Sequence, residues 1–537
     1  MSLMGSLYVG TSGLQTSQNA LNTTAHNMSN IDTTGYTRQQ VQLGTRFYQT
    51  ISTTASANAY QQVGHGVNYS NAKQIRDYFL DRTYRREAGR GGYYDASVSA
   101  IEEVEDLFQE LEGEAFAEAI DNLWVSVQEL TKDPSNSVNQ GVFVQRSSEF
   151  LTRAEAVYQG LSEYQDNLNI KIQDQIYTMN KYAERITELN QQILKIESGK
   201  VEHANDLKDE RNQLIDELAK MAKIEVKEDA DGNALIQLEG KDFVKAESYN
   251  RIALDYDEVT GFATPYWEQL AKKAIDANGM EYIDITSAEL FNVHQEISTD
   301  TNTDIGALKA IILARGEGRG TYKDLQVDTA TYQQGIKKSV IMNVQAEFDQ
   351  LLNKITTAIN DVFAKAAQAE TDRNPTSTYL RDQDGNPYTI FNTKTGEDDF
   401  TIDNIIINGT IKQSPSLLSF RKEDGKVDQE TADALKKLFT EEIHTLNPEV
   451  KTTTNFTNYY NNLISQVANT GAVLRGISEN QQVTVDSTAA AREQILGVSS
   501  DEELSNMIMF QNAYNASSRY INVVSELLEH IISTLGR

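Results

Sequence analysis

Histidine side chains are the first candidates for catalysis or metal binding in this sequence, because it contains no cysteine. The absence of cysteine excludes disulfides, thiolate metal sites and thiol nucleophiles. The six histidines are scattered, and none stands at metal-ligand spacing from another: His26, His65, His203, His294, His444 and His530. The zinc signature His-Glu-x-x-His is missing, and the stretch Val293-His294-Gln295-Glu296 does not replace it. We therefore expect no catalytic residue, no metal, no cofactor and no enzyme activity.

Three short glycine-containing stretches could bind an ion or a phosphate. Asp229-x-Asp231-Gly232 and Asp382-x-Asp384-Gly385 begin like calcium loops, but both lack the full register and the closing glutamate. Gly64-His65-Gly66 lacks the third glycine and the strand-to-helix context of a phosphate loop. We predict hairpin turns at the first two stretches and a turn with a positive φ angle at the third.

Length and charge narrow the class of protein. A chain of 537 residues is too long for one hydrophobic core and predicts several domains. A net charge of −30 argues against nucleic acid and against anionic membrane surfaces as partners. No apolar run approaches the roughly 20 residues of a membrane span, and residues 1–30 lack the basic and apolar regions of a signal peptide. We expect no membrane insertion and no cleaved signal peptide.

The two ends of the chain carry matching apolar patterns. Large side chains recur alternately three and four residues apart between Met4 and Met28, and again between Leu504 and Leu535. Ile508 widens the second stripe beyond a narrow two-helix seam. Each stripe alone fits an ordinary amphipathic helix on a globular core, but the match predicts that the two helices pair. The predicted assembly interface is Leu7, Leu14, Leu21, Met28, Leu504, Ile508, Tyr514, Ile521, Leu528, Ile532 and Leu535.

The middle of the chain alternates between helical and period-two patterns. Helical spacing runs over residues 93–221 with a stop at Asp133-Pro134-Ser135, and it returns at 322–368, 430–442 and 456–499. Period-two spacing begins near Ile224, and a short helix is expected at 267–277 within this insertion. A second strand is expected at 402–411. The fold class is therefore mainly α with β-rich insertions: paired, coiled-coil-like terminal helices, a long-helix bundle and a small outer β or α+β domain.

These patterns predict a division into domains that use distant parts of the chain. Residues 1–45 and 500–537 form a terminal helical core domain, and 46–222 with 304–499 form the helical bundle. Residues 223–303 form a β-rich insertion domain, and 374–411 form a short β insertion within the second half of the bundle.

A polar motif follows the first apolar stripe. Ser12-Gly13-Leu14, Gln18-Asn19-Ala20-Leu21 and the stretch from Asn27 to Gln39 resemble the N-terminal signature of bacterial flagellar axial proteins. The chain departs from that signature with Thr16 in place of an alanine and Asp32 in place of an asparagine. The residues that match are Asn30, Thr34, Gly35, Tyr36, Arg38 and Gln39.

Two later motifs narrow the resemblance. Residues 204–214 are similar to a stretch of the hook-associated junction proteins, with Asn205, Asp206, Leu207, Asp209 and Arg211 on the pattern. Physically this stretch is a helix start, with Asn205 or Asp206 expected as N-cap. Near the C-terminus, the family pattern places Phe510, Gln511 and Tyr514 in a helix that begins after Ser499.

The resemblance implies a structural role in the bacterial flagellum, as an adapter that joins hook to filament and is required for filament assembly. It implies an extracellular location reached through the flagellar export apparatus. The implied partners are further copies of the chain, the hook protein, a second hook-associated junction protein, and an export chaperone at the C-terminal helix. The alternatives are another axial protein of the hook or rod type, or a flagellar scaffold carrying an adhesin or enzyme in an insertion.

Overall fold

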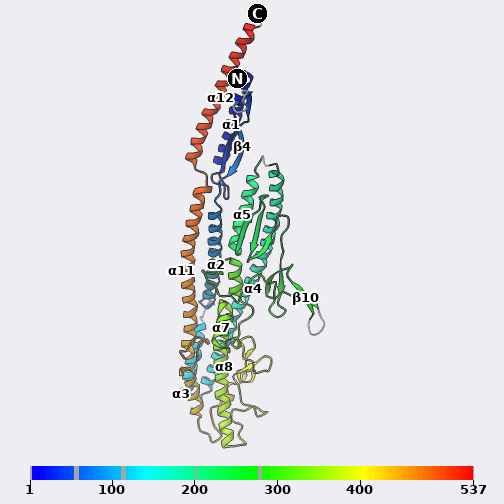
Figure 1. The fold of residues 1–537 in the computed structure, drawn as a ribbon. Coiled ribbons are helices and arrows are strands. Elements are labelled where there is room, and N and C mark those ends of the chain that lie inside the picture. Colours follow the sequence, from blue (N-terminus) through cyan, green and yellow to red (C-terminus); the bar gives the residue numbers. More distant parts are fainter. Residues whose placement is uncertain (1–2, 54–59, 110–115, 200–201, 276–280, 536–537) are drawn as a thin grey trace. The chain divides into compact units, whose positions relative to one another are not determined.

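The computed structural model describes residues 3–53, 60–109, 116–199, 202–275 and 281–535. Long helices dominate it, and the strands form short antiparallel ribbons (Figure 1). The mainly α fold with β-rich insertions is confirmed. The α-helices are α1 Leu3–Ser29, α2 Tyr78–Gln109, α3 Phe116–Lys132, α4 Ser137–Glu197, α5 Asn205–Met221, α6 Ala307–Arg315, α7 Thr329–Gln334, α8 Val340–Arg373, α9 Gly409–Gln413, α10 Gln429–Thr440, α11 Phe456–Leu496 and α12 Ser500–Leu535.

Each strand pairs with a neighbour close in sequence, except in the ribbon that follows α1. In that ribbon β1 Gln39–Thr45 pairs with β4 Val67–Gln74, while β2 Tyr48–Thr53 pairs with β3 Tyr60–Gly64. The remaining sheets are β5 Ile224–Glu228 with β6 Ala234–Leu238 and β7 Lys241–Val244, β8 Ile252–Tyr256 with β9 Ala263–Trp267, β10 Lys272–Ile275 with β11 Glu281–Asp284, and β12 Phe391–Thr393 with β13 Ile405–Ile407.

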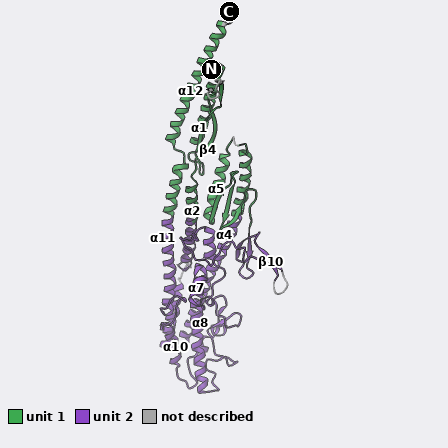
Figure 2. Ribbon diagram, in the orientation of Figure 1, with its two compact units in different colours: residues 1–89, 178–251, 482–537 green, residues 90–177, 252–481 purple. Residues whose placement is uncertain are grey.

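The chain divides into two compact units (Figure 2). The first contains Met1–Gly89, Thr178–Arg251 and Gln482–Arg537, and the second contains Arg90–Tyr177 and Ile252–Gln481. Helices α2, α4 and α11 contribute residues to both units. The division into terminal, bundle and insertion domains stays a prediction beside this grouping.

Packing in the first unit joins the two ends of the chain. Helix α1 lies along α12 and also contacts β1 and β4. A separate apolar cluster holds α5 against the end of α4; its members are Leu189, Ile193, Ala204, Leu207 and Leu214. Burial of such side chains contributes roughly 1.5–3 kcal/mol each.

Aromatic side chains form the centre of the second unit. The ring of Phe116 in α3 lies 4.8 Å from that of Phe348 in α8 and 5.2 Å from that of Tyr460 in α11, centroid to centroid. Phe108 in α2 approaches Phe348 edge-on at 5.7 Å. These edge-to-face contacts add to the burial energy of large side chains and fix how the four helices pack.

Several local expectations were wrong. The described part of the helix expected at 267–277, residues 267–275, is not helical: Trp267 ends β9, where its N–H donates to Ala288 O at 2.8 Å, and β10 follows. Residues 276 and 277 lie outside the described residues. Strand pairing therefore prevails over the helical spacing of this stretch. The run at 322–368 becomes a continuous helix only from Val340, after a break at Gly335. The strand expected at 402–411 is limited to β13, and α9 follows it.

The glycine turns match their predictions. Gly66, Gly232 and Gly385 have φ angles of 92°, 82° and 82°, a region that residues with a side chain rarely adopt. Gly232 lies in the turn between β5 and β6, and Gly385 lies in a tight turn closed by a bridge between Arg381 and Pro387. Both stretches that begin like calcium loops are therefore turns.

Candidate assembly surface and the motif network

Glycines allow α1 to approach α12 closely. A Cβ atom on Gly10 would lie 2.6 Å from Cγ1 of Ile521, and one on Gly13 would lie 2.7 Å from Oγ of Ser517. A side chain at either position would push the helices apart. Each glycine destabilises the helix by roughly 1 kcal/mol relative to alanine. The close contact with α12 explains why α1 contains glycine at these positions despite that loss.

The face that α1 buries differs from the predicted seam. Leu7, Leu14, Leu21 and Met28 are only half-buried, and the intervening seam positions Thr11, Gln18 and Ala25 are exposed. The buried side chains are small or polar: Ser12, Thr16, Ser17, Ala20, Thr24 and Asn27. The reason is that α1 packs on the ribbon as well as on α12, and ribbon backbone groups need polar partners. The hydroxyl of Ser12, for example, accepts from Val67 N–H at 3.3 Å.

The predicted stripe on α12 is largely uncovered within one chain. Leu504, Ile508 and Ile532 are 45%, 59% and 70% exposed, and Tyr514, Ile521 and Leu528 are half-buried. The side chain of Leu535 lies outside the described part of the structure. The sequence analysis omitted other exposed apolar residues on the same helix, namely Met509, Tyr520, Val523 and Leu527. Exposed apolar side chains repeated along one helix favour an interaction site.

The motif residues Phe510, Gln511 and Tyr514 lie on this helix as well. Gln511 is exposed, and Phe510 and Tyr514 are half-buried. These three side chains are therefore not fully covered by the fold of a single chain.

Asn27 organises the loop that leaves α1. Its amide Nδ2 donates to Gln39 O at 2.8 Å, while its Oδ1 accepts from Gln39 N–H at 3.0 Å and from the Tyr36 hydroxyl at 2.7 Å. Burial, together with nearby carboxylates, raises the pKa of Tyr36, so it stays a neutral donor. Gly35, with φ 81°, allows the chain to turn back. The sequence analysis placed Asn27 at the start of the motif stretch but assigned it no contact, because its hydrogen-bond partners depend on how the loop folds back.

The end of α1 is held by short polar contacts. Asn30 Nδ2 donates to His26 O at 2.9 Å, and Thr33 Oγ1 donates to Asn30 Oδ1 at 3.1 Å. Thr34 is exposed in the turn that follows. Asn30 therefore closes the helix, as its place in the motif requires.

The motif of α5 ties this helix to the ribbon and to the loop. Asn205 or Asp206 was expected as the N-cap, but both lie inside α5, which Ala204 precedes without a side-chain cap. Asn205 Nδ2 instead donates to Ala72 O of β4 at 3.0 Å. Asp209 accepts from Thr37 N–H at 3.2 Å, and burial raises the pKa of this carboxyl group. Asp206 is exposed, and Leu207 packs on the apolar cluster of α4 and α5.

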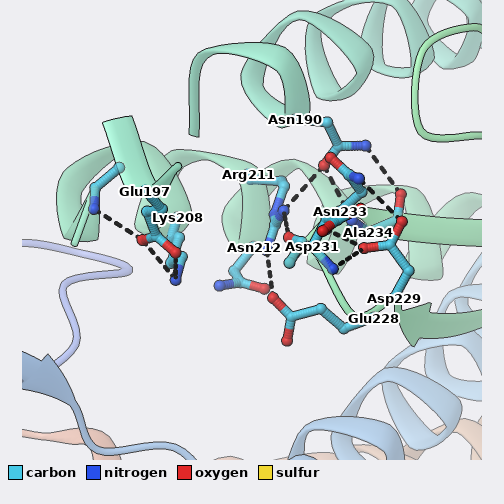
Figure 3. A network of polar contacts seen from close by, with 12 residues as sticks. Asn190, Glu197, Lys208, Arg211, Asn212, Glu228, Asp229, Asp231, Asn233 and Ala234 are labelled. Carbon is cyan, nitrogen blue, oxygen red and sulfur yellow. Dashed lines mark hydrogen bonds and ion pairs between the residues drawn. The ribbon is translucent and has the colours of Figure 1, made fainter. Parts of the chain in front are cut away.

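Arg211 clamps the hairpin of β5 and β6 to α4 (Figure 3). Its Nη1 donates to Asn190 Oδ1 at 2.9 Å and to Gly232 O at 2.8 Å, and its Nη2 lies 3.2 Å from Oε1 of Glu228. Asn190 in turn exchanges two hydrogen bonds of 3.0 Å with the backbone of Ala234. Burial lowers the pKa of Arg211, and Glu228 counteracts this change.

An ion-pair network joins α11 to α2 and α5 in the same unit. Arg492 contacts Asp81 Oδ1 through Nε and Asp216 Oδ2 through Nη2, both at 2.7 Å. Arg76 also binds Asp81, at 2.9 Å, and Arg85 binds Asp216, at 2.6 Å. Three arginines and two carboxylates thus hold the last turns of α11 against α2 and α5, which is a structural role.

Metal-binding clusters and membrane-spanning helices are both absent from the described residues. Within those ranges, no cluster of three or more His, Cys, Asp or Glu side chains could hold a metal ion. Over the same ranges, no helix is both long and apolar enough to cross a membrane.

Comparison with known proteins identifies the family. The pattern described as the flagellar hook-associated protein FlgK helical domain matches residues 101–378, which is more than half of the chain. The chain belongs to the flagellar hook-associated protein FlgK family. Two further patterns match the ends: that of the flagella basal body rod protein at residues 7–37, and that of the flagellar basal body rod FlgEFG protein C-terminal region at 494–534.

Whole-chain similarity agrees with this family. Flagellar hook-associated protein 1 of Bacillus subtilis (strain 168) is 26% identical over 526 residues, covering 97% of this chain and 96% of the relative. The protein of the same name from Escherichia coli (strain K12) is 23% identical over 553 residues, covering 97% and 98%.

The fold of this chain is similar to that of a solved FlgK structure. The flagellar hook junction protein FlgK from Burkholderia pseudomallei superposes with a TM-score of 0.55 at 11% identity, over 77% of this chain and 99% of that one. The family resemblance predicted from the motifs is confirmed. The chain is a structural component of the flagellum at the hook–filament junction.

Proposed function

We propose that copies of this chain join hook to filament by packing against one another through the uncovered stripe of α12, and that filament growth requires this contact. The observation that carries the proposal is the apolar surface left exposed on α12, together with exposed Met4 and Tyr8 on α1. An exposed apolar stripe is costly in water and is stabilised when a neighbouring subunit covers it.

The proposed interface keeps the residues predicted from the sequence. Leu504, Ile508 and Ile532 supply its exposed part, and the half-buried leucines of α1 supply its edge. The terminal domain of 1–45 and 500–537 would form the contact layer, with the bundle and the insertions at 223–303 and 374–411 attached to it.

The proposed partners follow from the family. The hook protein would lie on one side and a second hook-associated junction protein on the other. A chaperone would cover the same stripe of α12 inside the cell, before export through the flagellar apparatus to the outside. We propose no enzyme activity, because the histidines are scattered along the chain. The described residues of 223–303 form short antiparallel strands and turns, which fit an insertion without an adhesin or enzyme.

Ile508→Asp tests the interface, with Val259→Asp in the turn between β8 and β9 as the matched control. Ile508 is 59% exposed and Val259 is 92% exposed, so neither change should lower the thermal midpoint of the free chain. In the assembly, the first change buries an unpaired charge, which costs several kcal/mol. We expect cells with Ile508→Asp to leak flagellin into the medium without growing filaments, while Val259→Asp cells swim. Normal filaments on Ile508→Asp cells would contradict the proposal.

A further inference from the structure

The last two helices of the chain are separated by a short break (Figure 1). Helix α11 ends at Leu496 and α12 begins at Ser500. Helical hydrogen bonds continue on both sides, from Gly497 N–H to Glu493 O at 2.8 Å and from Glu503 N–H to Ser499 O at 3.0 Å. In an uninterrupted helix the carbonyl of Leu496 would accept from Ser500 N–H.

Arg38 takes the place of that missing donor. The N–H of Arg38 donates to Leu496 O at 2.8 Å, which satisfies one of the orphan carbonyls at the end of α11. The guanidinium of the same residue reaches the first turn of α12, where Nη1 lies 2.7 Å from Oε2 of Glu502 and Nε lies 2.8 Å from Oε1 of Glu503. One residue therefore bonds the end of one helix and the start of the next.

Burial distinguishes the two carboxylates. The side chain of Glu502 is 61% exposed, whereas that of Glu503 is 2% exposed. The carboxylate of Glu503 is therefore buried where it contacts Arg38. A buried carboxylate that loses its cation is strongly destabilised and turns toward water if the backbone allows it. Without the guanidinium, the first turn of α12 would have to rotate to expose Glu503.

Arg38 is itself fixed relative to other helices. The neighbouring residues are held by Asn27 of α1, through Gln39, and by Asp209 of α5, through Thr37. We propose that Arg38 is a positioning residue that sets the direction in which α12 leaves α11, so that α12 stays against α1. The link from Arg38 to filament growth rests on the proposed function of α12, but the positioning itself does not.

The cysteine-free chain allows a direct measurement of this position. A Cβ atom on Gly13 would lie 3.5 Å from Cβ of Ser517, within the roughly 3.5–4.5 Å of disulfides. Purified chain carrying Gly13→Cys and Ser517→Cys should therefore form an intrachain disulfide on oxidation. Adding Arg38→Gln, which keeps the backbone donor, should lower the fraction of disulfide severalfold.

Matched variants separate positioning from a general loss of charge. Arg519→Gln on the exposed surface of α12 should leave the disulfide fraction unchanged, and Arg38→Lys should restore part of it. Glu503→Gln should lower the disulfide fraction less than Arg38→Gln does, and adding it to Arg38→Gln should restore part of the fraction, because the buried carboxylate that would turn toward water is gone. An unchanged disulfide fraction with Arg38→Gln would overturn the proposal.

A rescue experiment tests the consequence for assembly. Purified chain is added to hooks that lack it, followed by the second junction protein and then flagellin, and filaments are counted. Arg38→Gln should reduce filament growth, and the oxidised disulfide between residues 13 and 517 should restore it. If the disulfide forms fully without restoring growth, Arg38 acts in some way other than positioning, and the proposal is wrong. Filament growth by Ile508→Asp chain would instead defeat the proposed function and leave the disulfide result standing.

Discussion

Replacing Glu347 by glutamine should make the second unit less sensitive to pH. Glu347 lies in α8 with no exposed surface, and its neighbours are neutral donors. Its carboxylate accepts from Asn447 Nδ2 at 2.8 Å, Gln466 Nε2 at 2.9 Å, Asn343 Nδ2 at 3.2 Å and the Tyr332 hydroxyl at 3.5 Å. Burial outweighs these hydrogen bonds and raises the pKa of Glu347 from 4.5 to about 7.

The direction of the pH effect follows from that pKa. Between pH 4.5 and about 7 the folded chain holds a proton that the unfolded chain has released, so this group lowers the free energy of unfolding as pH rises through that window. The difference between the two pKa values corresponds to roughly 3 kcal/mol of stability lost above pH 7. A glutamine is neutral at every pH and escapes that loss.

The assay can report on this unit alone. Both tryptophans of the chain, Trp124 and Trp267, belong to the unit that contains Glu347. Urea unfolding followed by tryptophan fluorescence at pH 5 and pH 8 should show that Glu347→Gln gains stability relative to the natural chain as pH rises, by up to roughly 3 kcal/mol. Glu258→Gln, in an exposed turn, is the control. Equal pH dependence in the Glu347→Gln variant and the natural chain would refute the reasoning.

Three further substitutions test single contacts. Asp349→Asn should destabilise the second unit by roughly 1–3 kcal/mol at pH 5 in the same urea assay, because its two oxygens accept from Tyr322 and Ile402 N–H at 2.8 and 2.7 Å and an amide offers one acceptor. The difference from the natural chain should be smaller at pH 8, because burial raises the pKa of Asp349 to about 7 and the natural chain loses stability as pH rises toward that value. Asn27→Ala removes three hydrogen bonds and should speed proteolysis within residues 30–39. Arg211→Met should accelerate amide exchange at residues 228–234, whose turn it holds.

Each of these three predictions can be contradicted by a specific result. Unchanged urea unfolding of Asp349→Asn would show that the two backbone donors find other partners. Proteolysis of Asn27→Ala at the natural rate would mean that the loop is held elsewhere. For Arg211→Met, the matched control is Lys227→Met, at an exposed position of β5. Equal amide exchange in both variants would show that Arg211 does not hold the turn.

The sequence alone was sufficient for the class of protein and for most helices. The scattered histidines, the absence of cysteine and the terminal motifs are properties of the sequence that can be identified without a structure. Long helices such as α4 were predictable because helical periodicity repeats many times within one segment. The turns at Gly232 and Gly385 were predictable because glycine is the residue that adopts a positive φ without strain.

Tertiary structure decided which residues of those elements matter. Residues 267–275 contain the end of β9, a turn and β10, because Trp267 and Lys272 pair with residues on other strands, whereas their local spacing also suits a helix. Asn205 donates to Ala72 of β4 and is not an N-cap. In both places a distant partner overrides the local preference.

The terminal region shows the same limit most clearly. Apolar spacing predicted that α1 and α12 pair, but the buried face of α1 is set by Gly10, Gly13 and the polar ribbon. The contact of Arg38 with Glu503 joins residues 465 positions apart. Helical periodicity arises from bonds between near neighbours, so it can be read locally; a contact between distant residues exists only once folding has brought their backbones together.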